Sequence, residues 1–169
     1  MPTRTPADAA PPSRRKTAAP KPGSTPTGHM DAVDLLMADH RDVEAWFEEF
    51  EKTESVARKQ KLATQICAAL RVHTQIEEEI FYPACRAAGI EEDKLDEAQV
   101  EHDEAKHLIE EIEAMAPDDD LYDAKVKVLS EEIEHHIEEE EKRMEGLFAQ
   151  ARKAGLDMDA LGEQLAEPT

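Results

Sequence analysis

The chain has 169 residues, with 20 basic and 40 acidic side chains and a formal net charge of −20. This length is enough to bury a single hydrophobic core. The acidic surface attracts cations and repels nucleic acid and anionic membranes. No apolar run approaches the roughly 20 residues of a membrane span, and the N-terminus lacks the apolar segment of a secretory signal. Composition therefore argues against membrane and nucleic-acid partners and favours a cytoplasmic protein.

Residues 1–29 are rich in proline, alanine, threonine and basic residues and show no periodicity. This composition predicts a disordered tail before one folded domain over residues 30–169. Cys67 and Cys85 fall on one predicted helix, 18 residues apart, which is about 27 Å along a helix axis. They cannot form a disulfide with each other, and this also favours a reducing cytoplasm.

Two amphipathic helices are predicted in the first half of the domain. The first covers residues 31–52, and its inward positions are Val33, Leu36, His40, Val43, Phe47 and Phe50. The second covers residues 55–88, with Ser55 as N-cap and Gly89 as its stop, and Pro83 is expected to kink or loosen its last turns. Its inward positions are Ala63, Ile66, Leu70, His73, Glu77, Ile80 and Ala84.

Two further helices complete the predicted domain. The third covers residues 92–116 and ends at Pro117; its inward positions are Leu95, Ala98, His102, Ala105, Ile109 and Ile112. The fourth begins after the capping cluster Asp118-Asp119-Asp120 and runs to Gly155. Its inward positions are Val126, Leu129, Ile133, His136, Glu140, Met144 and Leu147. Residues 157–166 add a short fifth helix. Short connections and the lack of strand-like alternation predict an all-α, up-down-up-down antiparallel four-helix bundle.

Each of the four helices places a histidine on its inward face, and two of them add a glutamate one turn later. The six residues are His40, His73, Glu77, His102, His136 and Glu140. Residues four apart face the same way on a helix, so each His-x-x-x-Glu pair directs two ligands to one point. A lone inward histidine is more often a satisfied core residue. Six polar groups in a dry core, however, would be costly unless a metal compensates them.

The composition of this set indicates which metal it suits. Imidazole and carboxylate without thiolate, in more than four candidates, fit iron better than structural zinc. Two glutamates from different helices can each bridge two metal ions, and carboxylate-bridged iron pairs are known inside four-helix bundles.

Four segments resemble, in order, the helices of hemerythrin-like (HHE cation-binding) domains: DLLMADHRDVEAWFEEF, HTQIEEEIFYPA, VEHDEAKHLIEEI and IEHHIEEEEKRM. The resemblance covers about residues 31–155. It implies a non-haem centre of two iron ions with an oxo or hydroxo bridge, and it places the ligands at the six residues above. It also implies oxygen binding, sensing of oxygen or redox state, or the handling of iron and peroxide.

The chain departs from the oxygen-carrying members at two places. Lys106 stands where they have a second histidine on the third helix, and the nearby His107 is predicted to lie on the surface because it is about 140° around the helix from His102. The last histidine and its acid are spaced by four residues as His136 and Glu140. Pairs with the carriers' spacing of five, His135–Glu140 and His136–Glu141, remain alternatives.

The missing histidine leaves coordination positions open to dioxygen, peroxide or nitric oxide, and it disfavours a stable oxygen carrier. Glu44 and Lys106 are candidates for orienting ligands, although an exposed helix acid is the default for Glu44. Tyr82 is expected to pack in the core, with the site as the alternative. The leading function is a di-iron protein that binds or senses a small oxidant. A redox enzyme acting on peroxide or ferrous iron and a metal store are the alternatives, and no nucleophile–base pair is evident.

Overall fold

The computed structural model describes residues 30–167, and all of its regular elements are helical. The helices are α1 (Ala32–Lys52), α2 (Val56–Ile76), η1 (Glu77–Phe81), α3 (Tyr82–Ala87), α4 (Glu92–Glu113), α5 (Tyr122–Glu141), α6 (Leu147–Lys153) and α7 (Met158–Leu165). None of the described helices is long and apolar enough to cross a membrane. The predicted N-terminal tail lies outside the described residues.

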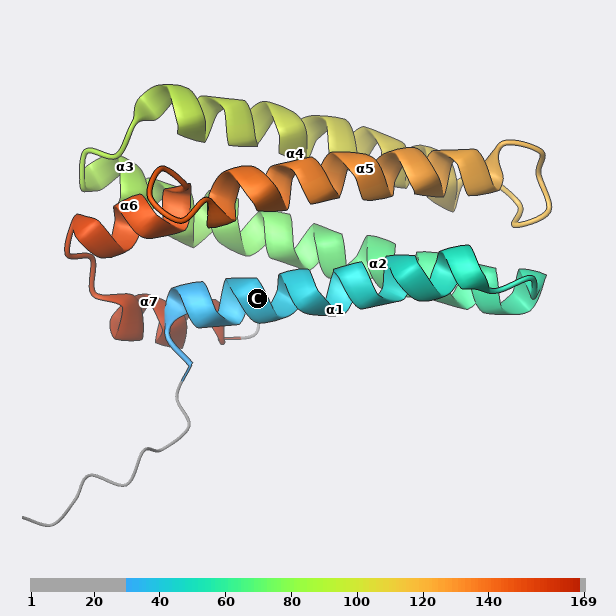
Figure 1. Ribbon diagram of the computed structural model, residues 1–169, viewed down its shortest axis with the longest axis horizontal. Coiled ribbons are helices and arrows are strands. Elements are labelled where there is room, and N and C mark those ends of the chain that lie inside the picture. The colour runs from blue at the N-terminus through green and yellow to red at the C-terminus, as the bar shows by residue number, and fades with distance from the viewer. Residues whose placement is uncertain (1–29, 168–169) are drawn as a thin grey trace, which may run out of the picture.

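The four long helices α1, α2, α4 and α5 form a bundle, as predicted (Figure 1). The helix α1 packs against α2 and α5, and α4 packs against the same two helices. In Figure 1, α1 leads to a turn at the right end, α2 returns to the left, α4 runs to the right, and α5 returns. Each long helix is therefore antiparallel to the one before it.

Local signals explain several helix boundaries. The Asp31 carboxylate accepts a hydrogen bond from the Asp34 N–H at 3.0 Å, and the Ser55 hydroxyl accepts one from the Arg58 N–H at 3.3 Å, so both residues cap helix N-termini. Gly89 has φ +76°, the left-handed conformation that follows α3. The predicted aspartate cap of the fourth helix is wrong: α5 has Leu121 at its N-cap, without a side-chain hydrogen bond.

A π-helical turn, η1, interrupts the second predicted helix just before Pro83, the residue that the sequence predicts to disturb it. The Tyr82 N–H donates to the Glu77 carbonyl, five residues back. This adds one residue to the turn and rotates the inward face by one position. Phe81, Tyr82 and Cys85 are consequently buried. The predicted inward positions Ile80 and Ala84 are only half-buried, which corrects the periodic reading after Glu77.

The fourth helix ends earlier than predicted. The helix α5 stops at Glu141, the chain turns, and α6 begins at Leu147. A Cβ on Gly146 would clash with the Glu140 carbonyl oxygen, so the turn requires glycine there. Met144, predicted to face inward, is 84% exposed because it lies in this turn. The predicted short fifth helix is confirmed as α7, which packs on α1.

Two apolar clusters fill the bundle and leave a polar layer between them. One cluster gathers the start of α1 with α3, α6 and α7, and the other fills the opposite end of the four long helices. On α1, His40 lies between Leu36 of the first cluster and Val43 of the second. The predicted ligands therefore lie in a layer closed at both ends by hydrophobic packing.

Candidate metal centre

The structure brings all six predicted ligand residues together in this polar layer, and none of them is more than 5% exposed. The helix α1 contributes His40, α2 contributes His73, η1 contributes Glu77, α4 contributes His102, and α5 contributes His136 and Glu140. Their convergence follows from the helical period. Each residue occupies a core position of its own helix, and the helices pack at matching depth.

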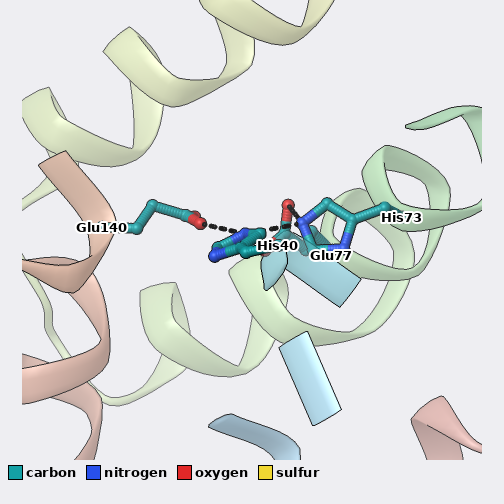
Figure 2. A group of neighbouring side chains, drawn as sticks. All are labelled: His40, His73, Glu77 and Glu140. Atoms are coloured by element: carbon teal, nitrogen blue, oxygen red, sulfur yellow. Dashed lines mark hydrogen bonds and ion pairs between the residues drawn. The ribbon is translucent and has the colours of Figure 1, made fainter. Parts of the chain in front are cut away.

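Two groups of donor atoms form within the layer, and each group has its atoms within 4.8 Å of one another. The first contains His40, His73, Glu77 and Glu140 (Figure 2). In it, His40 Nε2 lies 3.0 Å from His73 Nε2 and 3.5 Å from a Glu140 oxygen. His73 Nε2 lies 3.3 Å from Glu77.

The second group contains Glu77, His102 and His136. The Nε2 atoms of the two histidines are 3.1 Å apart, and His102 Nε2 lies 3.3 Å from Glu77 Oε2. Glu77 therefore belongs to both groups. Glu140 also reaches toward both sides, because its Oε2 is 3.5 Å from His40 and 3.6 Å from His136. The two glutamates thus lie between two pairs of histidines.

Each of the four histidines has a carboxylate on its outer nitrogen, Nδ1. The pairs are His40 with Glu141 at 2.8 Å, His73 with Asp39 at 3.3 Å, His102 with Glu78 at 2.9 Å and His136 with Glu101 at 2.7 Å. An ionised carboxylate only accepts hydrogen bonds, so Nδ1 donates to it, and Nε2 is the ring nitrogen that faces inward. This is the support that metal-binding histidines usually have.

These four supporting carboxylates were missed from the sequence, although a local signal exists. Each is a chain neighbour of an inward ligand: Asp39 precedes His40, Glu78 follows Glu77, Glu101 precedes His102, and Glu141 follows Glu140. Each one serves the histidine of an adjacent helix and not that of its own. The partner depends on helix packing, which periodicity within one helix does not report.

The structure also places the other residues that the sequence suggests near the site. Lys106 Nζ lies 2.5 and 2.7 Å from the two oxygens of Glu78, so Lys106 holds the carboxylate that supports His102. Glu44 is paired with Arg41 at the surface, outside the site. The side chains of His107 and His135 are 75% and 60% exposed. Glu141 faces the outer side of His40, so the geometry favours Glu140 as the inward acid of α5.

Tyr82 enters the site, contrary to the expectation of simple core packing. Its hydroxyl lies 2.8 Å from Glu140 Oε1, 3.4 Å from Glu77 Oε2 and 3.3 Å from His102 Nε2. The extra residue of η1 turns it inward. Burial, together with the charges of Glu140 and Glu77, raises the pKa of Tyr82 well above its ordinary value. Tyr82 therefore keeps its proton, and its hydroxyl donates a hydrogen bond to the Glu140 carboxylate.

The electrostatics of this layer fit a bound cation. Burial and the charge of Glu77 raise the pKa of Glu140 to about 8, whereas Glu77 is held at a pKa of about 2, against burial, by His73 and His102. Among the described residues, Glu77 Oε1 and Glu140 Oε2 have no hydrogen-bond partner. Buried oxygens without partners are costly, and a metal ion bound by these carboxylates and the inward Nε2 atoms would compensate them.

A helical bundle with inward histidines and glutamates in one buried layer belongs to the class of helical metal-binding proteins. The family model described as the hemerythrin HHE cation binding domain matches residues 31–148, and the chain belongs to that family. The predicted resemblance is thereby confirmed.

Two individual proteins are similar to the chain. A DNA nickase of Nostoc sp. (strain PCC 7120 / SAG 25.82 / UTEX 2576) is 31% identical over 123 residues, which make up 73% of this chain and 34% of the relative. The chain thus spans about a third of that relative's length. The crystal structure of an HHE cation binding domain-containing protein from Mycobacterium kansasii matches with a TM-score of 0.65 and 21% identity, covering 80% of this chain and 83% of that one. This match shows the shared fold.

Proposed function

We propose that the chain is a non-haem di-iron protein that binds or senses a small oxidant such as dioxygen, with peroxide and nitric oxide as further candidates. The ligands in this proposal are His40, His73, Glu77, His102, His136 and Glu140. The observation that carries it is the pair of buried donor groups that share Glu77. A carboxylate shared by two donor groups suits two metal ions better than one.

The donor chemistry supports iron as the metal. The two groups contain imidazole nitrogens and carboxylate oxygens but no thiolate, and together they offer more donors than the four of a structural zinc site. When bound, ferrous iron supplies electrons and an open coordination position for an oxidant. The protein contributes fixed imidazoles, each held by a carboxylate, and the Tyr82 hydroxyl, which is a hydrogen-bond donor at Glu140.

A small cavity supports an oxidant as the ligand. It has a volume of about 10 Å³ and lies against the four histidine rings, with Val43, Leu70, Ile133 and Ile137 among its other lining residues. This volume is close to that of one water-sized probe. The four aliphatic side chains make part of its wall apolar, which suits a small, weakly polar ligand, and Asp39 and Thr74 line the rest together with the histidines.

A redox enzyme using the same centre is the second candidate, and Tyr82 favours it. A phenol 2.8 Å from Glu140 is a hydrogen-bond donor and an oxidisable group next to the proposed ligands. A metal store is the third candidate. Binding without turnover, turnover and storage predict different responses to the same oxidant.

Anaerobic loading with ferrous iron, followed by optical spectra as air is admitted and then removed, separates these functions. We expect an absorption band that appears with oxygen. Reversal of the band on removing oxygen supports binding, and irreversible oxidation with turnover of added peroxide supports the enzyme. Iron uptake without any response to either oxidant supports storage, and no iron uptake contradicts all three.

The nickase activity named for the cyanobacterial relative is not favoured by the composition of this chain. DNA binding relies on cationic side chains that neutralise phosphates, and the chain has 40 acidic residues against 20 basic ones. We expect the iron-loaded protein to leave supercoiled plasmid intact. Nicking that is lost in a His40→Ala variant would contradict this expectation and assign the activity to the same centre.

A further inference from the structure

A narrow cleft between α4 and α5 reaches the proposed centre. Its volume is about 20 Å³, and its lining includes the carboxylates of Glu97, Glu101, Glu139 and Glu140 together with the ring of His136. Glu97 and Glu101 lie one turn apart on α4, and Glu139 and Glu140 are neighbours on α5. The cleft is therefore acidic along both of its walls.

The exposure of these carboxylates falls along the cleft toward the centre. Glu97 is exposed, the side chains of Glu139 and Glu101 are 31% and 22% exposed, and that of Glu140 is 1% exposed. At the inner end, Glu140 Oε2 has no hydrogen-bond partner among the described residues. A buried carboxylate oxygen that lacks a hydrogen-bond partner, at the end of an acidic cleft, points to a cation.

We propose that this cleft is the route by which ferrous iron reaches the centre. Glu97 and Glu139 attract the hydrated cation at the mouth, Glu101 lies further in, and Glu140 receives it beside His136. Clefts lined by charges of one sign concentrate ions of the opposite sign and raise their association rates. Lys94 also lines the cleft, and Lys142 forms an ion pair with Glu139. These two ammonium groups are outnumbered by the four carboxylates of the lining. This inference rests on the proposed iron site.

The rate of iron uptake tests the route separately from the site. The double variant Glu97→Gln and Glu139→Gln removes two charges from the mouth and leaves the proposed ligands intact. Glu110→Gln with Glu134→Gln is the matched control, because it removes the same charge from exposed positions on the same two helices outside the cleft. Iron-free protein, checked for helicity by circular dichroism, is mixed anaerobically with a ferrous salt, and protein-bound iron is measured over time.

We expect uptake to slow by at least about fivefold at low salt in the mouth variant alone. The difference should shrink as salt screens the charges, and the final iron content should not change. Equal uptake rates in both double variants, with full iron content, would overturn the route and leave the proposed function standing. Failure of the unaltered protein to take up iron would instead overturn the proposed function.

A second measurement uses the iron-loaded protein and does not depend on the stability of the iron-free form. A Glu97→Cys variant is labelled with a bulky neutral maleimide at the mouth. Burial raises the pKa of Cys67 to about 11 and that of Cys85 to about 12, so the new exposed thiol reacts first. Loss of ferrous iron to a chelator should slow several-fold relative to an equally labelled Glu110→Cys control. Equal loss from the two labelled proteins would contradict the route.

Discussion

Two histidines on α4, five residues apart, provide a sharp test of the site. His102 is 1% exposed, and its ring lies within 3.3 Å of Glu77 Oε2 and of the Tyr82 hydroxyl. His107 is exposed, and its nearest charged partner is Glu111 at 3.9 Å. The substitutions His102→Ala and His107→Ala remove the same side chain from the same helix. His102 lies inside the polar layer, and His107 lies outside it.

The expected magnitude for His102→Ala follows from what the ring leaves behind. Removal of the ring deprives the buried Glu77 of its contact with Nε2 and deprives Glu78 of its hydrogen bond with Nδ1. Leaving a buried polar group without its hydrogen-bond partner costs about 1–3 kcal/mol, and more when the group is charged. For a protein of this size, such a loss lowers the melting temperature by several degrees or more. The second donor group also loses one of its three residues, so iron content should fall to about half or less.

Iron analysis and thermal unfolding of the two variants, purified in parallel, measure both effects. His107→Ala should match the unaltered protein in both, because an exposed side chain contributes little. Loss of iron from His107→Ala with retention in His102→Ala would refute the helical phase of α4 and the site built on it.

Three further outcomes are expected. Chelation should lower the melting temperature by several degrees, because a ligand bound only to the folded state stabilises that state; an unchanged melting curve after verified metal removal would contradict this. Burial and Glu77 raise the pKa of Glu140 to about 8, above the ordinary 4.5, so the folded metal-free protein retains a proton there that the unfolded chain loses. The stability of the metal-free protein should therefore fall as pH rises from about 4.5 to 8. Metal affinity should rise over the same window, because the metal displaces the proton. Titrations showing the opposite slopes would count against a buried Glu140 ligand. Glu101→Gln weakens the hydrogen bond to His136 Nδ1 and should reduce metal affinity by about 10- to 100-fold. Competition with a chelator measures this affinity. Equal affinity in the variant and the unaltered protein would show that Glu101 is not needed to support His136.

The bundle and its inward histidines could be predicted from the sequence because both depend on the period of 3.6 residues within single helices. His40, His73, His102 and His136 each occupy a position where the apolar period requires a buried residue, and the structure buries all of them. The same period identified Glu77 and Glu140 as inward acids.

Features set by contacts between helices were not predicted. The π-helical turn η1 breaks the period after Glu77 and turns Tyr82 into the site. The turn after Glu141 depends on the close approach of Gly146 to the Glu140 carbonyl. Asp39 supports the histidine of α2 although it lies on α1. None of these contacts leaves a periodic signal in the sequence.

The central claim is that two iron ions occupy the pair of donor groups joined by Glu77. Metal analysis of protein loaded anaerobically with ferrous iron and then freed of unbound metal tests it most directly, with a Glu77→Gln variant measured alongside. The account predicts close to two irons per chain in the unaltered protein and a clear loss in the variant, since Glu77 belongs to both groups. A single tetrahedral zinc, no retained iron, or full iron content in Glu77→Gln would contradict it.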